Sequence, residues 1–255
     1  MKKNTFARVV MFSVLVVLVA ASSNSFARKK PGKGDTNMAI KGKVLLEEDF
    51  TTPSVYTKDF QPTKEGWSVK AGHAKWVKSG KGVESVWETG HMPVLGYSGT
   101  FRDAVIEVDF RFQKEEGKWA ACRISAANPE LNPRAYAASV WANSDNKARA
   151  LGMVLEHDEW KPGVITTVDS LMATYQPNKW YTLRLELIGN NAQATCNGVT
   201  VFGTHELFGI PKNSISLGVG TCKHELRNFR VYEATLNPTW RPSKPQLTQQ
   251  NSNIP

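Results

Sequence analysis

The chain has 255 residues and a formal net charge of +9. It contains no P-loop, dinucleotide-binding fingerprint or Gly-x-Ser-x-Gly elbow, which argues against nucleotide-dependent enzymes and α/β-hydrolases. Its three cysteines, Cys122, Cys196 and Cys222, are too far apart for a zinc motif. They allow at most one disulfide, and the sequence does not choose among the three pairings.

Residues 1–27 have the pattern of a secretory signal peptide. A basic start precedes an apolar run over residues 9–21, and small residues stand at Ser25 and Ala27. The run has about 13 residues, fewer than the roughly 20 that span a bilayer. We therefore expect cleavage after Ala27 and a secreted or periplasmic protein.

Both ends of the expected mature chain look unstructured. Residues 28–43 carry six Lys or Arg and one acidic residue, Asp35, which is typical of a basic disordered linker. Contact of this arm with anionic polysaccharide or with an envelope surface is the alternative. Nucleic acid is not an expected partner of an exported chain. The Pro-, Gln- and Asn-rich residues 241–255 are expected to form a disordered tail.

Residues 44–240 are predicted to form one all-β domain. Apolar and polar residues alternate in VIEVDFRF (105–112) and in WYTLRLELIG (180–189), as in half-buried strands. Asn197-Gly198 lies between two β-prone runs and predicts a hairpin. A short helical turn is expected in TVDSLMATY (167–175), and residues 134–155 are ambiguous between strand and helix. Many short strands with Gly, Pro and Asn turns favour a two-sheet antiparallel jelly-roll sandwich of the concanavalin A-like lectin/glucanase type.

Several segments also carry a family resemblance. LEEDF, GWSVKAGHAKWV, VIEVDFRF, NKWYTLRLELIGNNAQATCNG and IPKNSISLGVGTCKHELRNFRVYEATLNPTW resemble concanavalin A-like jelly rolls of secreted bacterial proteins. The resemblance is closest to the 3-keto-disaccharide hydrolase-like domain family and to secreted relatives in Planctomycetes-type bacteria. It covers about residues 44–240 and implies a glycosidase-type activity. In GKWAACRIS (117–125), Arg123 fits the arginine that the family carries on a central strand, without the Asn-Ser-Gly portion that usually precedes it.

Two carboxylates in the middle of the chain are candidate catalytic groups. Family 16 laminarinase-type hydrolases share this fold and carry Glu-x-Asp-x-Glu or Glu-x-Asp-x-x-Glu on one strand. Glu107 and Asp109 match the first two positions, but Arg111 and Phe112 stand where the third carboxylate belongs. The two carboxylates are about 6.6 Å apart by strand rise, close to the spacing of about 5–5.5 Å that retaining glycosidases need.

The same strand has two other interpretations. In one, its charges form a ladder of ion pairs with neighbouring strands across a solvated sheet face. In the other, this polar face binds sugar hydroxyls. If the chain is an enzyme, Glu107 or Asp109 would be the base and Arg123 would stabilise negative charge on oxygen. The charged residues expected on this face are Glu107, Asp109, Arg111, Arg123, Arg184 and Glu186.

Tryptophans are numerous for this length, and their rings stack on sugars. Three lie at strand starts and are expected in the core, whereas four lie nearer loops. The core set is Trp67, Trp76 and Trp180. The candidates for an exposed platform are Trp87, Trp119, Trp141 and Trp160, of which Trp87 and Trp141 are the preferred sugar contacts.

Metal sites are not expected. The acidic segment LEHDEW (155–160) lacks the spacing of a calcium loop, and four scattered histidines have no partner at zinc-ligand spacing. These are His73, His91, His205 and His224. No cofactor is predicted, and calcium is the one ion that the sequence leaves open.

Three functions follow from these observations. The first is a secreted carbohydrate-binding module that takes a glycan or small saccharide on one sheet face. The second is a glycoside hydrolase or lyase acting on a disaccharide or glucoside, with a 3-keto sugar suggested by the resemblance. The third is a non-catalytic envelope structural protein. The sequence identifies neither the glycan nor the oligomeric state.

Overall fold

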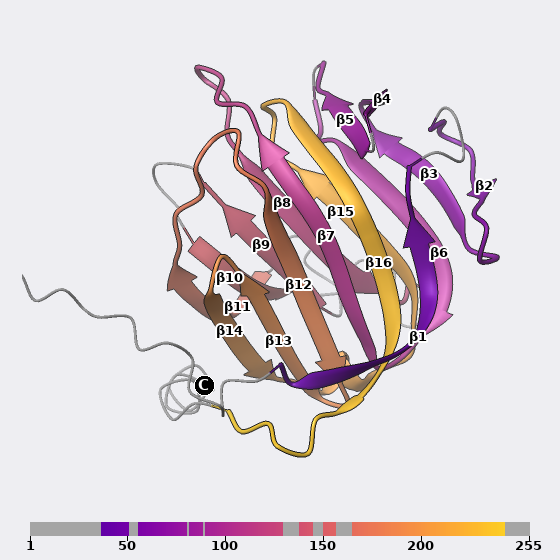
Figure 1. The fold of residues 1–255 in the computed structure, drawn as a ribbon, viewed down its shortest axis with the longest axis vertical. Helices are drawn as coiled ribbons and strands as arrows, with labels where there is room; N and C mark the ends of the chain where they lie inside the picture. The colour runs from indigo at the N-terminus through magenta and orange to yellow at the C-terminus, as the bar shows by residue number, and fades with distance from the viewer. Residues whose placement is uncertain are drawn as a thin grey trace, which may run out of the picture. The chain divides into compact units, whose positions relative to one another are not determined.

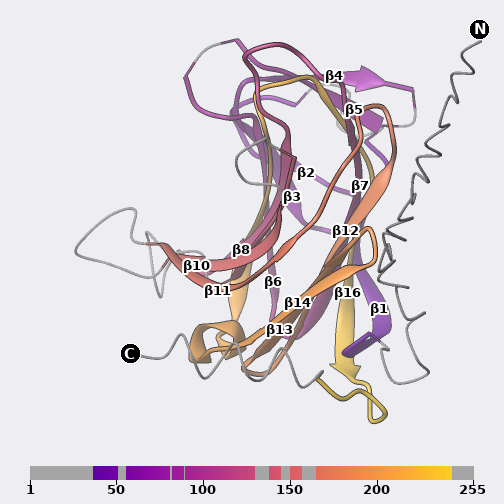
Figure 2. The same ribbon diagram turned by 90° about the vertical axis from the view of Figure 1, so that its left-hand side faces the viewer.

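The computed structural model describes residues 37–50, 56–80, 82–88, 90–129, 138–144, 150–156 and 165–242. These residues form two antiparallel eight-stranded sheets that pack face to face, as Figures 1 and 2 show. The all-β, two-sheet jelly-roll prediction is therefore confirmed. In the described part of the chain, no helix is long and apolar enough to cross a membrane.

Sheet A has a linear order of seven strands, and an eighth, β1, pairs with β16. In spatial order its strands are β14 (Val199–Thr204), β13 (Asn191–Cys196), β12 (Tyr181–Ile188), β7 (Ala104–Phe112), β16 (His224–Leu236), β5 (Gly82–Val86) and β4 (Lys75–Ser79), with β1 (Ala39–Glu48) beside β16.

Sheet B lies against the other side of the core. In spatial order its strands are β11 (Ile165–Met172), β10 (Ala150–Glu156), β9 (Ala138–Asn143), β8 (Ala121–Ala127), β15 (Lys212–Val219), β6 (Val94–Phe101), β3 (Ser68–His73) and β2 (Gln61–Pro62). One turn of 3-10 helix, η1 (Glu206–Gly209), precedes β15.

The alternation in the sequence decides which side chains enter the core. On β7, the apolar positions from Ile106 to Phe112 are almost completely buried, while the polar positions between them are partly exposed. β12 behaves in the same way with Leu183 and Leu185. Burying these side chains between the sheets supplies the main stabilisation, at about 25 cal/mol per Å² of apolar surface. Trp67 and Trp76 lie in this core, as predicted.

Two expectations about local structure were wrong. Residues 39–43, placed in the disordered linker, begin β1, because this segment pairs with the end of β16 in the register Ala39↔Leu236. The segment 167–175, where a helical turn was expected, is mostly strand β11, paired with β10. Its β-branched start, Ile165 to Val168, favours a strand, and pairing with β10 satisfies its backbone hydrogen bonds. The predicted signal peptide and most of the predicted tail lie outside the described residues.

A second, smaller apolar cluster forms on the outer side of sheet A. Met38 and Ala39 cover Val105, Ile188 and Phe202 there, and the partly buried Tyr232, Ala234 and Trp240 pack against them. The backbone N–H of Asn237 donates to the Met38 carbonyl at 2.8 Å, which holds the segment before β1 to the segment after β16. This end of the outer face of sheet A is therefore already covered by the protein itself.

Candidate functional site

The outer face of sheet A carries the predicted charge ladder. Glu107 accepts from Arg184 at 3.0 Å and from Lys41 at 2.6 Å, and Arg184 also donates to Glu186 at 2.8 Å. Glu186 is fully buried, accepts the Ala39 N–H at 2.6 Å, and has its pKa raised by burial. Glu186 and Arg184, predicted as ligand-binding residues, are therefore occupied with holding β1 against the sheet.

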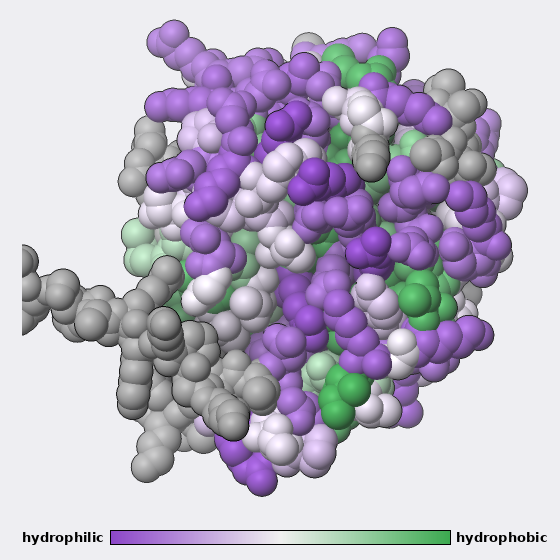
Figure 3. Space-filling view, in the orientation of Figure 1, coloured by the Kyte–Doolittle hydropathy of each residue, from purple (hydrophilic) through white to green (hydrophobic). Residues whose placement is uncertain are grey.

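The other end of this face is also saturated with internal contacts. Arg111 makes a two-pronged contact with Glu225, with both donor–acceptor distances at 2.8 Å. Asp109 accepts from Thr182 at 2.6 Å and from Asn228 at 2.7 Å. Such contacts favour a charge ladder over a general acid, which must hold a proton. Figure 3 shows a mostly hydrophilic surface on this side.

Trp180 is not in the core, contrary to prediction. The centre of its ring lies 3.8 Å from the guanidinium carbon of Arg227 and 4.9 Å from that of Arg111, on the outer face of sheet A. Its neighbour Tyr181 faces inward, and the alternation of the strand therefore turns Trp180 outward. Two guanidinium groups already pack against the indole, which makes the ring a poor platform for a sugar.

The outer face of sheet B has a different character. Arg123 on β8 lies beside Trp141 on β9 and Gly218 on β15 in the strand register. The guanidinium carbon of Arg123 is 4.7 Å from the centre of the Trp141 ring. Arg123 is 8% exposed, so it is largely shielded from solvent. A shielded guanidinium stacked on an indole presents fixed N–H donors beside an aromatic surface.

Small residues surround this pair. Ser125 and Ser139, next to it on β8 and β9, are paired in register, and their hydroxyls hydrogen-bond at 2.8 Å. On the same face of sheet B, the strand register places further small residues on β10, β11, β15 and β6. They are Gly152, Ser170, Ser214, Ser216, Gly218, Gly96 and Ser98. Such side chains leave a shallow floor on which a flat ligand can lie close to the backbone.

Glycine is required at one of these positions. A Cβ atom on Gly218 would lie 2.7 Å from the Met92 methyl group and 3.3 Å from Nε of Arg123. By contrast, Cβ atoms on Gly96 and Gly152 would meet nothing closer than 3.9 Å and 3.7 Å. Gly218 thus packs closely against Met92 and Arg123, whereas a Cβ on either of the other two glycines would make only ordinary contacts.

Aromatic residues gather at one end of this face. The Trp119 and Trp141 ring centres are 6.2 Å apart, and the ammonium group of Lys118 lies 5.7 Å from the Trp87 ring. The Trp87 indole N–H is buried and has no hydrogen-bond partner among the described residues. Trp119 and Trp141, two of the four predicted platform tryptophans, therefore lie together at this end of sheet B, and Trp87 lies beside Lys118. The fourth, Trp160, is outside the described residues.

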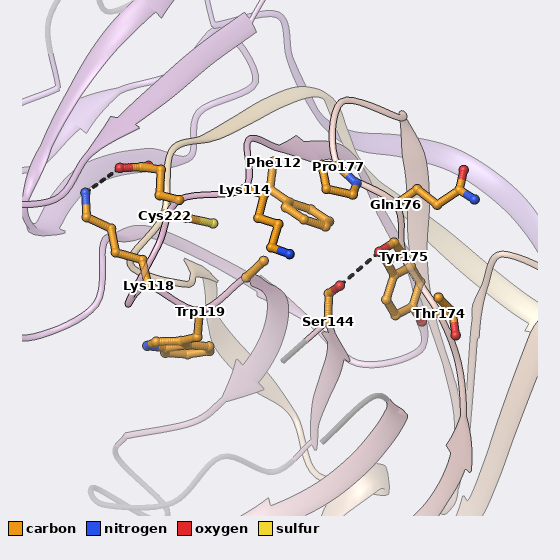
Figure 4. A pocket seen from close by; sticks show the side chains of 12 residues that line it. Phe112, Lys114, Lys118, Trp119, Ser144, Thr174, Tyr175, Gln176, Pro177 and Cys222 are labelled. Atoms are coloured by element: carbon orange, nitrogen blue, oxygen red, sulfur yellow. Dashed lines mark hydrogen bonds and ion pairs between the residues drawn. The ribbon is translucent and has the colours of Figure 1, made fainter. Parts of the chain in front are cut away.

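A pocket of about 280 Å³ adjoins Trp119 at the end of the sandwich, as Figure 4 shows. It lies where β7, β9 and β11 end and where the β15–β16 turn closes the core. Its lining combines apolar side chains with a few polar ones: Phe112, Lys114, Glu115, Lys118, Trp119, Ala120, Ser144, Thr174, Tyr175, Gln176, Pro177 and Cys222.

Cys222 in this pocket lies next to a histidine but is not an activated nucleophile. Its Sγ is 3.8 Å from Nδ1 of His224, but this nitrogen lies 2.7 Å from the Cys222 carbonyl oxygen and must donate to it. Burial raises the pKa of the Cys222 thiol to about 12 and lowers the pKa of His224 to about 4. The thiol therefore stays protonated at neutral pH. All three cysteines are buried and free.

No cluster of three or more His, Cys, Asp or Glu in the described residues could hold a metal ion. Two of the histidines, His73 and His91, stack with ring centres 4.3 Å apart. Burial of His73 and the neighbouring His91 lower the pKa of His73. Most of the segment 155–160, including its acidic side chains, lies outside the described residues, so the calcium question stays open.

The structure separates the three residues predicted to act together in catalysis. Glu107 and Asp109 point outward from sheet A, whereas Arg123 points outward from sheet B. The prediction assumed that β7 and β8 pair because they are consecutive. The connection 113–120 instead crosses from one sheet to the other, and its length of eight residues was a signal against a tight hairpin.

Within the predicted sugar-contact set, Arg123 and Trp141 lie on sheet B, and Arg111, Arg184 and Glu186 lie on sheet A. Trp87 directly follows β5 of sheet A. Sequence reasoning missed the pocket residues Lys114 and Tyr175. They come from loops, which have no periodic pattern, and nothing in their local sequence marks them as functional.

Several solved structures are similar to this chain in fold. The carbohydrate-binding module CBM66 from Bacillus subtilis is 12% identical, with a TM-score of 0.51 over 69% of this chain and 100% of that chain. SCLam, a non-specific endo-β-1,3(4)-glucanase from family GH16, is 12% identical, with a TM-score of 0.52 over 78% of this chain and 96% of that one. At such identities the likeness shows the fold alone.

A third structure contains bound sugars. It is a variant of LamA from Z. galactanivorans in complex with laminaritriose and laminaritetraose, 10% identical, with a TM-score of 0.53 over 76% of this chain and 100% of that one. No curated protein sequence matches this chain. The family described as the 3-keto-alpha-glucoside-1,2-lyase-like domain matches residues 57–232, more than half of the sequence, and the chain therefore belongs to this family.

Proposed function

We propose that this protein binds a saccharide on the outer face of sheet B. The observation that carries the proposal is the stacking of Arg123 on Trp141 at 4.7 Å, on a sheet face otherwise lined by glycine and serine. A guanidinium has N–H donors in a fixed planar arrangement that suits sugar oxygens, and an indole offers a flat apolar surface to the C–H groups of a pyranose ring.

The opposite face is the weaker candidate for this role. Glu107, Asp109 and Arg111 are each engaged with neighbouring side chains, and β1 covers the end of that face near Glu186. A sugar would have to displace these contacts before it could form its own hydrogen bonds. On sheet B, Gly96, Gly152 and Ser216 are small and partly exposed, whereas Ser125 and Ser139 are buried.

The comparisons support a saccharide as the ligand class. A carbohydrate-binding module and LamA in complex with laminaritriose and laminaritetraose share the fold of this chain. The family name itself refers to a modified glucoside. These likenesses do not identify the sugar, and the site on sheet B is argued from this chain alone.

The test is a glycan-array screen of the purified protein, followed by calorimetric titration of any hit. Trp141→Ala should weaken binding about five- to thirtyfold, because loss of one stacking ring removes on the order of 1–2 kcal/mol. Trp180→Ala, which removes a ring of the same size from sheet A, is the matched control and should bind normally. Loss of binding in the Trp180 variant with retention in the Trp141 variant would move the site to the other sheet.

Cleavage of a 3-keto-α-glucoside is the second candidate, favoured by the family match. In such a sugar the ketone at C3 acidifies the hydrogen on C2. A base would take this proton, the C1–O bond would break, a C1=C2 double bond would form, and the departing alkoxide would take up a proton. Arg123 would stabilise the negative charge on the C3 oxygen.

Two observations place binding ahead of cleavage. No Asp or Glu lies on β6, β8, β9 or β15, the strands that carry Arg123 and its neighbours, and their outward side chains are mainly glycine and serine. His73 ends the same row as Arg123 but lies three strand spacings away, about 14 Å, which is too far to act on the same sugar ring.

Product analysis separates the two functions. The protein would be incubated with a 3-keto-α-glucoside, and release of the C1 alcohol would be followed with time. If binding is the function, the glucoside remains intact. Release that disappears in Arg123→Ala would make the protein an enzyme. If no saccharide binds at all, the non-catalytic envelope protein becomes the leading function.

We also propose that the protein is exported and that its mature chain begins after Ala27. The basic start, short apolar run and small residues of the first 27 positions support this proposal. Mass spectrometry of the protein recovered from the periplasm or the medium tests it. A mature N-terminus at Arg28 is expected, and an intact Met1 in the cytoplasmic fraction would contradict the proposal.

A further inference from the structure

The pocket at the end of the sandwich is continuous with the proposed sugar face. Trp141, which stacks on Arg123, lies 6.2 Å from Trp119, and Trp119 lines the pocket. A saccharide lying on the Trp141 ring would therefore extend over Trp119 with its end at the pocket. This step rests on the proposed function.

The size and floor of the pocket suit a single sugar unit. Its volume of about 280 Å³ is just below the range of about 300–1,000 Å³ that drug-sized ligands occupy. Phe112, Ala120, Tyr175 and Cys222 form an apolar part of the lining, and each is at most 8% exposed. Ser144, Thr174 and Gln176 add hydrogen-bonding groups at the sides.

The charges around the pocket do not cancel. Lys118 pairs with Glu115 at 2.6 Å, and Figure 4 shows the two side chains turned toward each other. Glu115 also accepts the backbone N–H of Lys223. Lys114 makes no ion pair within the described residues, and in Figure 4 its ammonium group reaches in among the labelled side chains between Phe112 and Ser144. One positive charge thus remains uncompensated beside an apolar surface.

We infer that the saccharide carries an anionic group, a carboxylate or a sulfate ester, and that Lys114 pairs with this group in the end pocket. Lys114 is exposed, so water screens its charge, and its attraction for an anion is that of a surface ion pair. A lysine is a compact charge with three rotatable donors, and it accepts either anion without a fixed geometry. Trp119 and Trp141 would align the neutral part of the chain.

The experiment compares three trisaccharides with the same β-glucan backbone. One is neutral, one ends in glucuronate, and one carries a terminal 6-O-sulfate. The wild-type protein should bind the acidic forms about 1.5- to fivefold more tightly than the neutral form at low salt, and the preference should shrink as salt screens the pair. The acidic form that binds more tightly identifies the natural anion.

Two variants test whether Lys114 causes the preference for the acidic sugars. Lys114→Gln should remove the preference and leave the affinity for the neutral sugar unchanged. Lys43→Gln makes the same charge change on β1 of the other sheet and should keep the preference. A preference that survives Lys114→Gln, or that Lys43→Gln removes, would overturn the inference.

The design also separates this inference from the proposed function. If all three sugars bind equally well and Trp141→Ala weakens all of them, the saccharide site stands and the anionic specificity is wrong. If none of the three sugars binds and the glycan array shows no other hit, the saccharide site itself is wrong, and the role of Lys114 fails with it.

Discussion

Replacing Glu48 with glutamine should stabilise the protein at neutral and alkaline pH. Glu48 ends strand β1 and is 3% exposed, and one of its carboxylate oxygens accepts the Phe50 N–H at 2.7 Å. Burial is the main cause that raises the pKa of this carboxyl from 4.5 to about 7. The neutral, protonated form is therefore the one that the folded protein prefers.

The size of the effect follows from the pKa shift. A folded-state pKa above the unfolded value means that the contribution of Glu48 to stability is fully present below about pH 4.5 and is lost as the pH rises through about 7. At 1.36 kcal/mol per unit, the loss is about 3 kcal/mol. Glutamine cannot ionise, and its carbonyl oxygen can still accept the Phe50 N–H.

Denaturant unfolding of wild type and Glu48→Gln between pH 4.5 and pH 8.5 tests this reasoning. The free energies of unfolding should be similar at the acid end, and the variant should be about 3 kcal/mol more stable at pH 8.5. Glu47→Gln is the control, because Glu47 is the adjacent residue, is half exposed and pairs with Arg230 on the surface. A difference between Glu48→Gln and wild type that does not change with pH would refute the argument.

Three further predictions concern single residues. Gly152→Val should abolish saccharide binding in calorimetry, because the valine side chain would stand on the outer face of sheet B beside Trp141. It should not lower the melting temperature, because replacing a glycine within a strand stabilises the protein by roughly 0.5–1 kcal/mol. Burial lowers the pKa of His224 to about 4. The free energy of unfolding should therefore fall by about 3 kcal/mol as the pH falls from 6.5 through 4. His224→Phe should flatten this part of the curve of stability against pH. The pKa of Lys212 is lowered to about 8 by burial, so stability should rise between pH 8 and pH 10.5 as the amine loses its proton, and Lys212→Met should remove this rise in the same assay.

The sequence predicts the fold well because the strands alternate. In β7 and β12, apolar and polar residues follow one another with period two, and such a pattern can bury only one face of a strand. Prediction from this pattern fails where pairing with a distant strand outweighs the local composition. Residues 39–43 are rich in lysine and glycine and look like a linker, yet they pair with β16 and bury Ala39 against Glu186.

The sequence predicts individual residues of the candidate site but not which of them lie together. Arg123, Trp141 and Trp87 were selected by residue type and place in the chain. The meeting of Arg123 and Trp141 on sheet B depends on the register of β8 with β9 and on the path of the chain between the sheets, neither of which a periodic pattern contains. For the same reason Glu107 was grouped with Arg123, although the two residues point outward from opposite sheets.

The two outer faces differ in a way that bears on where a ligand binds. Sheet A fills its outer face with long charged side chains that neutralise one another, the usual way to cover a sheet exposed to water. Sheet B places Gly96, Gly152 and Gly218 on adjoining rows of its outer face, although each glycine in a strand costs roughly 0.5–1 kcal/mol relative to alanine. Gly218 makes room for Met92 and Arg123, but Gly96 and Gly152 relieve no internal clash. A ligand lying on these positions would offset their cost through contacts with the backbone that larger side chains would block.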